Sequence, residues 1–255
     1  MAERTLHERY HELHALRGEA LERYGRLPYP QTGGPPARAY FPAVGRRLPP
    51  FASVRLGPLV VTDFPPIAQV ALAEFARLRR PVRVLEIGPG RGALAGLLQA
   101  RYPETIAAYL GLELDPHVEG PYARVASIGA IDGPVDVVIA SEVIEHIPSE
   151  TFFAEYLTPL ARALAPDALL IASTPNPLVP GGIVRDFTHV QNYPWYDLYA
   201  LLRLVFERVE ITRTHYVCNA ARLFGFLPRV LVTAAQELDW TEGLIAIARG
   251  PIPRG

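Results

Sequence analysis

The 255-residue sequence predicts an α/β fold built on a doubly wound, mainly parallel sheet. Short apolar runs typical of buried strands alternate with stretches whose apolar residues recur at helical spacing. A glycine-rich turn over residues 88–92 joins one such run to a helical stretch, as between a parallel strand and its crossover helix. We expect one domain over residues 67–255, preceded by an N-terminal helix and a proline-rich arm over residues 1–66.

The composition is that of a globular protein without a strong electrostatic field. Hydrophobic residues make up 49% of the chain, charged residues make up 20%, and the formal net charge is -1. This balance argues against general binding of nucleic acid or of an anionic membrane. Cys218 is the only cysteine, which excludes an internal disulfide. The N-terminus lacks the apolar core of a signal peptide and no apolar run approaches a membrane span, so we expect a cytoplasmic protein.

The first 66 residues fall into two parts. Residues 3–24 predict an amphipathic helix, and its apolar positions are Leu6, Tyr10, Leu13, Leu16, Ala20 and Leu21. His7, His11 and His14 lie beside this stripe, where a solvated or interface face is a simpler interpretation than a metal site. Many prolines and several aromatic residues in 28–66 predict an ordered arm with a short strand at 59–62. That arm either packs on the back of the domain or forms part of a lid over a substrate.

The glycine turn follows the first strand of the domain. Residues 67–80 predict a helix, residues 82–87 a buried strand and residues 93–100 a helix whose first amides face the turn. The glycines satisfy G-x-G-x-G as well as G-x-G-x-x-A, so they alone do not choose a cofactor. Glu86 stands two residues before the first glycine, where an acid suits a cationic or amine-bearing ligand better than a pyrophosphate.

The resulting pattern E-x-G-x-G-x-G resembles the first motif of the class I S-adenosylmethionine-dependent methyltransferases. The resemblance implies a Rossmann-like, seven-stranded sheet that ends in an antiparallel hairpin. It also implies that Glu86, Gly88, Gly90 and Gly92 contact S-adenosylmethionine.

Further cofactor contacts are expected at the ends of the next strands. Residues 106–114 predict the second strand, and Glu113 near its end can accept hydrogen bonds from the ribose of an adenosyl or an NAD ligand. Residues 122–128 predict a weaker strand, and the resemblance places Ser127 and Ile128 beside the adenine ring. The usual acid of the family is absent there unless Asp132 supplies it. Ser141, after the fourth strand at residues 135–140, is assigned to the same site.

The segment after the fourth strand carries the expected catalytic groups. Glu142, Glu145 and His146 are spaced at i, i+3 and i+4, so one helical turn would place all three at the carboxyl edge of the sheet. The run D-V-V-I-A-S-E-V-I-E-H-I resembles the corresponding motif of many small-molecule and RNA O-methyltransferases. Because the sulfonium donor is already activated, the protein mainly positions the acceptor and removes the proton of a hydroxyl. We expect His146 to be the general base, with Glu145 beside it.

A metal site is an alternative use of the same residues. Glu142, Glu145, His146 and the distant His189 offer two carboxylates and two imidazoles, a set that suits Mg²⁺, Mn²⁺ or Fe²⁺. Such an ion would bind acceptor hydroxyls and lower their pKa. The segment is similar to the metal-binding motif of small-RNA 2′-O-methyltransferases, but Thr188 stands where they have an acid. Many relatives with the same E-H pair bind no metal.

The remaining elements complete the expected sheet. Residues 152–164 and 195–206 predict helices. Strands are predicted at 168–173, 209–217 and 243–249, and the last two suit the hairpin of the resembled fold. A long irregular connection at 175–194 lies at the active edge, where such connections usually carry function.

We therefore expect a methyltransferase that acts on oxygen of a small molecule or a glycan, as a monomer or a homodimer. The alternatives are an RNA ribose 2′-O-methyltransferase, an NAD-dependent oxidoreductase and a catalytically silent adenosyl-binding module.

Overall fold

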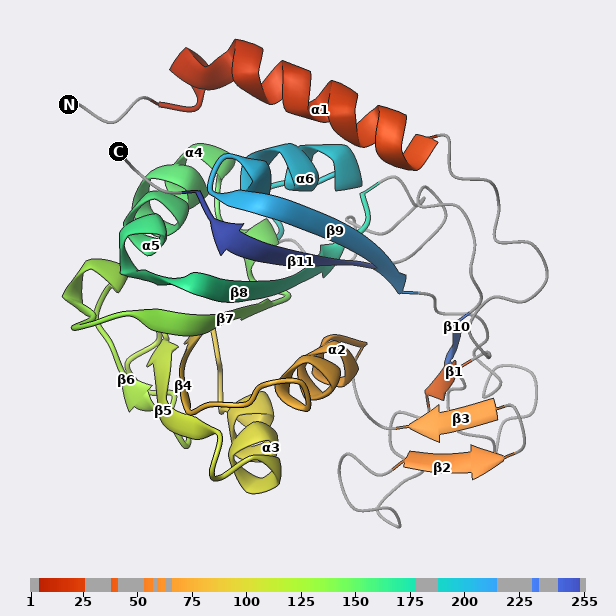
Figure 1. Ribbon diagram of the computed structural model, residues 1–255, viewed down its shortest axis with the longest axis vertical. Coiled ribbons are helices and arrows are strands. Elements are labelled where there is room, and N and C mark those ends of the chain that lie inside the picture. The colour runs from red at the N-terminus through yellow and green to blue at the C-terminus, as the bar shows by residue number, and fades with distance from the viewer. Residues whose placement is uncertain are drawn as a thin grey trace.

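The structure is a computed structural model that describes residues 5–25, 38–40, 53–56, 59–62, 66–177, 188–214, 231–233 and 243–252. Helices cover both faces of its main sheet, and a smaller sheet lies to one side (Figure 1). Within the described residues, no helix combines the length and the apolar character needed to span a membrane.

The main sheet has seven strands in the order β6-β5-β4-β7-β8-β11-β9. Its strands are β4 (Val82–Ile87), β5 (Ile106–Leu112), β6 (Ala123–Arg124), β7 (Val135–Ser141), β8 (Leu164–Pro175), β9 (Phe206–Thr214) and β11 (Gly243–Pro251). β11 runs antiparallel to both β8 and β9, whereas the pairs from β6 to β8 are parallel. The predicted doubly wound, Rossmann-like sheet with a final antiparallel hairpin is thereby confirmed.

Two apolar layers hold the helices to this sheet. On one face, α2 (Pro66–Phe75) and α3 (Ala93–Arg101) bury Phe75 and Leu98 against Val84 and Val137. The other face is covered by α4 (Ser149–Thr151), a π-helix η4 (Phe152–Leu157), α5 (Thr158–Ala163) and α6 (Trp195–Arg203). Because successive residues of a strand point to opposite faces, β4 contributes Val84 to the first layer and Leu85 to the second. The sheet is thus packed on both faces, and its carboxyl edge lies between the two layers.

Several predicted boundaries are wrong. The strand expected at 122–128 is reduced to β6, because the chain turns into the 3₁₀-helix η2 (Ile128–Ala130), which buries Ile128. The strand expected at 209–217 already begins at Phe206. The helix expected at 152–164 is a π-helix over its first six residues and ends at Ala163.

The N-terminal helix α1 (Tyr10–Gly25) packs on α6, as Figure 1 shows. Glu19 accepts a hydrogen bond from the hydroxyl of Tyr199 at 2.5 Å, which ties the two helices together. The predicted apolar stripe is too wide, because Tyr10 and Leu21 on one border are 57% and 50% exposed. The inward residues are Leu6, Leu13, Leu16 and Ala20. The three histidines are exposed, as expected for a solvated face.

A second sheet joins the proline-rich arm to the connection between β9 and β11. Its order is β10-β1-β3-β2, with β1 (Arg38–Tyr40), β2 (Ser53–Leu56), β3 (Leu59–Thr62) and β10 (Leu231–Thr233). The strand expected at 59–62 is thus confirmed as β3. β10 pairs antiparallel with β1 and belongs to the connection between β9 and β11. Because Thr214 and Pro175 both pair with Gly243, that connection leaves from the carboxyl edge of the main sheet.

Candidate active site

The glycine turn between β4 and α3, residues 88–92, forms a cradle. Neighbouring side chains crowd Gly88 and Gly92, whereas the space at Gly90 is open. Gly88, Gly90 and Gly92 all have left-handed backbones, with φ of 63°, 52° and 71°. A Cβ at Gly92 would lie 2.5 Å from Cδ of Pro121, and a Cβ at Gly88 would lie 2.6 Å from Cγ2 of Val143. A Cβ at Gly90 would meet no atom within 4 Å. The space above Gly90 can therefore hold part of a ligand in close contact with the backbone.

Glu113 lies beside this cradle at the end of β5. Its Oε2 accepts a hydrogen bond from the Gly90 amide at 2.9 Å, and its Oε1 accepts one from the Asp115 amide at 3.0 Å. The hydroxyl of Tyr122 donates to the Gly90 carbonyl at 2.7 Å. The acid one strand over from the turn thus lies beside Gly90, and its contact with ribose hydroxyls of a ligand stays a prediction.

Glu86 is buried below the turn, with 3% of its surface exposed. Its Oε2 accepts a hydrogen bond from the hydroxyl of Tyr109 at 2.6 Å. Burial raises the pKa of Glu86 to about 7, although the hydrogen bond from Tyr109 acts in the opposite direction. This carboxyl group faces the α2–α3 layer, to which Tyr109 belongs, and a contact with the cofactor stays a prediction.

We expect Glu86 to make folding stability fall as the pH rises from about 4.5 to about 7. In the unfolded chain the group ionises near 4.5, whereas in the folded protein it keeps its proton until about 7, so unfolding releases a proton in this window. The free energy of unfolding then falls by about 3 kcal/mol across the window. Urea unfolding at pH 5 and pH 8 would show this loss in the wild type and a smaller one in Glu86→Gln. Equal losses in both proteins would contradict the assignment.

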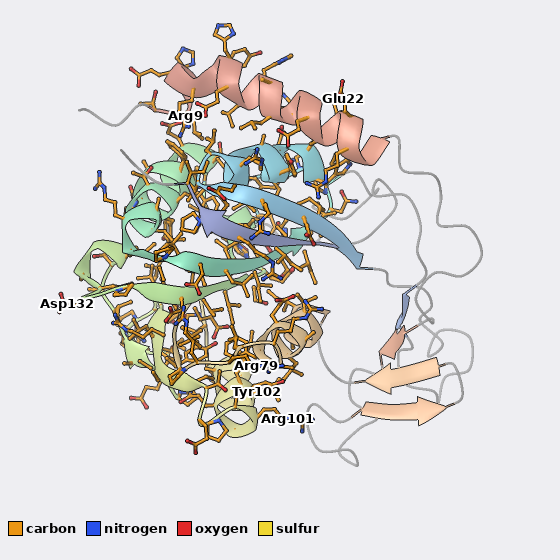
Figure 2. All side chains as sticks on the ribbon, in the orientation of Figure 1. Arg9, Glu22, Arg79, Arg101, Tyr102 and Asp132 are labelled. Carbon is orange, nitrogen blue, oxygen red and sulfur yellow. The ribbon has the colours of Figure 1, made fainter. Side chains whose placement is uncertain are left out.

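The other predicted cofactor residues are dispersed around the edge. Ser127 is exposed at the start of η2, and Ser141 is the last residue of β7. Ile128 is 2% exposed and lines a groove of about 460 Å³ between η2 and α5. The side chain of Asp132 lies at the periphery of the molecule in Figure 2, just before β7 begins. It is therefore remote from the carboxyl edge and does not replace the missing acid.

The segment after β7 lies directly against the glycine turn. Val143 is the residue that a side chain at Gly88 would overlap, which places the 3₁₀-helix η3 (Ile144–His146) next to the cradle. Glu142 has a left-handed backbone with φ of 49°, uncommon for a non-glycine residue and often found at functional sites. Its amide donates to the carbonyl and to Oγ of Ser173, both at 3.2 Å, so the end of β8 holds this conformation.

Three of the four predicted metal residues come together at this place. Ligand atoms of Glu145, His146 and His189 all lie within 4.8 Å of one another. The rings of the two histidines pack edge to face at 4.9 Å, and Nε2 of His189 lies 4.0 Å from Oε1 of Glu145. The amides of Val190 and Gln191 both donate to the Glu145 carbonyl at 3.0 Å, which fixes the two segments to each other.

Glu142 is not part of this three-residue group. The pKa of its carboxyl group is raised by desolvation, and interactions with Ser173, His189 and His146 oppose the rise. Its carboxyl group therefore interacts electrostatically with both imidazoles, but its oxygens do not belong to the group of ligand atoms that lie within 4.8 Å of one another.

Thr188 orients the imidazole of His146. Nδ1 of His146 lies 3.1 Å from the Thr188 carbonyl and 3.0 Å from its hydroxyl. Because a carbonyl oxygen only accepts, Nδ1 carries the proton of the neutral ring, and Nε2 is then the basic nitrogen. In sequence Thr188 is notable only as a departure from the metal-binding motif. Its role was missed because no periodic pattern connects it to a histidine 42 positions away.

The comparisons with known proteins agree on one type of domain. A family described as "Methyltransferase domain" matches residues 64–227. Trans-aconitate 2-methyltransferase of Methylobacterium nodulans is 37% identical over 112 residues, which cover 40% of this chain and 41% of that relative. The match thus spans less than half of the curated relative. A structure of a methyltransferase from Archaeoglobus fulgidus aligns with a TM-score of 0.52 and 21% identity over 71% of this chain and 94% of the other, a likeness of fold.

Proposed function

The chain belongs to the methyltransferase domain family matched over residues 64–227, and on that basis we propose that it transfers the methyl group of S-adenosylmethionine to oxygen of a small molecule or a glycan. The net charge of -1 favours such an acceptor over RNA, because phosphate recognition relies on clustered positive charge.

The residues of the cradle fit an adenosyl cofactor. Gly90 leaves open space above the backbone, and Glu113 stands at the end of the neighbouring strand with carboxylate oxygens that can accept from ribose hydroxyls. When bound, S-adenosylmethionine would supply a methyl group activated by the positive sulfur. What the chain itself must add is an aligned acceptor and a group that takes its proton.

The observation that carries the proposal is the oriented imidazole of His146 next to the glycine turn. Thr188 holds Nδ1 in the donor role, so Nε2 is the nitrogen that accepts a proton from an acceptor hydroxyl. Methyl transfer would join the methyl carbon to the acceptor oxygen as its bond to sulfur breaks, and Nε2 of His146 would take the proton of the hydroxyl. Glu145, 3% exposed beside the two imidazoles, stabilises the imidazolium that results.

The proposed activity is tested by binding and by labelling. Calorimetry is expected to detect binding of S-adenosylhomocysteine, and labelled methyl groups are expected to enter small molecules or glycans of a fractionated cell extract. Binding without label in any fraction would instead indicate a silent adenosyl-binding module. Chelator-sensitive label in short RNA would indicate a ribose methyltransferase. If the protein did not bind S-adenosylhomocysteine but quenched the nicotinamide fluorescence of NADH, an oxidoreductase would be indicated.

A metal-assisted reaction is a second candidate, favoured by the convergence of Glu145, His146 and His189. One carboxylate and two imidazoles suit Mn²⁺ or Fe²⁺ better than Mg²⁺, which prefers oxygen ligands. A bound ion would supply Lewis acidity at an acceptor hydroxyl.

Chelation separates the two candidates. On the base-catalysed route we expect methyl transfer to survive dialysis against a chelator, and His189→Gln to retain more activity than His146→Gln. Loss of activity on chelation, recovery with Mn²⁺ or Fe²⁺, and equal losses in the two variants would establish the metal route instead.

A further inference from the structure

Tyr122 occupies a place that three glycines leave for it. A Cβ at Gly111, inside β5, would overlap the Tyr122 ring, and so would a Cβ at Gly120. A Cβ at Gly92 would come within 3.2 Å of the same ring and still closer to Pro121. Glycine inside a strand is unfavourable by itself and often marks the close approach of another group. The approaching group is here the phenol of Tyr122.

The hydroxyl of Tyr122 is directed at the central residue of the glycine turn. It donates to the Gly90 carbonyl at 2.7 Å, while the Gly90 amide donates to Glu113 at 2.9 Å. Glu113 therefore holds the peptide group before Gly90, and Tyr122 holds the peptide group after it. A Cβ placed at Gly90 would meet no atom within 4 Å, so the space in that direction is open.

This arrangement has a consequence for the ligand. Gly90 has a φ of 52°, which glycine reaches without strain, and no atom lies within 4 Å of where its Cβ would be, so packing on that side does not restrict it. Without an anchor the peptide group after Gly90 would sample other orientations, and a ligand that packs on it would have to order it on binding.

We propose that Tyr122 is a positioning residue for the cofactor, which fixes the Gly90 carbonyl and so keeps the cradle in its binding shape before the ligand arrives. This inference rests on the proposed function, because it takes S-adenosylmethionine as the occupant of the cradle. Because the Tyr122 hydroxyl acts through the Gly90 carbonyl, we expect its effect on affinity and not on the chemical step.

The test uses Tyr122→Phe, which keeps the ring in its glycine-lined place and removes only the hydroxyl. We expect the Kd of S-adenosylhomocysteine and the KM of S-adenosylmethionine to rise about five- to tenfold, the range of one lost neutral hydrogen bond. The kcat at saturating cofactor should not change. Tyr102→Phe is the matched control, because its hydroxyl donates to the Leu72 carbonyl at 2.9 Å at the far end of α3.

The outcomes separate this inference from the proposed function. A rise in Kd and KM in Tyr122→Phe with unchanged kcat, and no rise in Tyr102→Phe, supports the positioning role. Equal Kd in the wild type and Tyr122→Phe overturns it while the proposed function stands, even if both variants lower the melting temperature. A wild type that does not bind S-adenosylhomocysteine overturns both.

Discussion

Replacing His146 by glutamine is expected to lower kcat for methyl transfer by about 10²- to 10⁴-fold, the usual contribution of a general base. The amide of glutamine is not basic, so it cannot accept a proton from the acceptor hydroxyl at neutral pH. Because His146 acts on the acceptor side, the Kd of S-adenosylhomocysteine should stay at the wild-type value. Single-turnover transfer of labelled methyl and calorimetry measure the two quantities separately.

His14→Gln is the control for this variant. It makes the same replacement on the exposed face of α1, outside the cluster of Glu145, His146 and His189. We expect His14→Gln to keep full activity. If His146→Gln kept more than a tenth of the wild-type kcat, a base role for His146 would be excluded.

Gly90→Ala is expected to weaken cofactor binding by about 10²-fold while the protein still folds. The new methyl group meets no atom of the chain but would occupy the open space of the cradle, and an overlap of this kind costs about 3 kcal/mol. The left-handed backbone at φ of 52° adds a folding cost of about 1–2 kcal/mol. The Kd of S-adenosylhomocysteine and the free energy of unfolding in urea give the two effects.

Two neighbouring glycines provide the comparison. Gly92→Ala should lose more stability than Gly90→Ala, because its Cβ would lie 2.5 Å from Pro121 in addition to the left-handed strain. Gly96→Ala, within α3, should gain about 1 kcal/mol, because its Cβ would lie at an ordinary 3.7 Å from Pro121 and alanine favours the helix. Normal cofactor affinity in Gly90→Ala would place the ligand elsewhere.

The arrangement of the sheet could be predicted from the sequence because its signals are local. The apolar run at 82–87, the glycine turn and the apolar residues after it each express a regular period. Even the orientation of Glu86 follows from alternation, since it shares a face with Val82 and Val84, and both belong to the layer under α2 and α3.

The parts of the site that escaped prediction depend on contacts between distant segments. Thr188 reaches His146 across 42 positions, and Tyr122 reaches Gly90 across 32. Neither Thr188 nor Tyr122 is linked to its distant partner by a hydrophobic period or a motif. The ring of Tyr122 packs toward Gly111, and the ladder of the third predicted strand with β5 begins at the next residue, Ala123.

The pairing of β1 with β10 also bears on how the chain can be shortened. β10 stands at one end of the small sheet and, among the described strands, takes its hydrogen bonds from β1. A protein that began at residue 66 would keep β10 and lose the strand that covers it. An uncovered strand edge is a template for pairing with a second chain. N-terminal trimming should therefore promote self-association and precipitation.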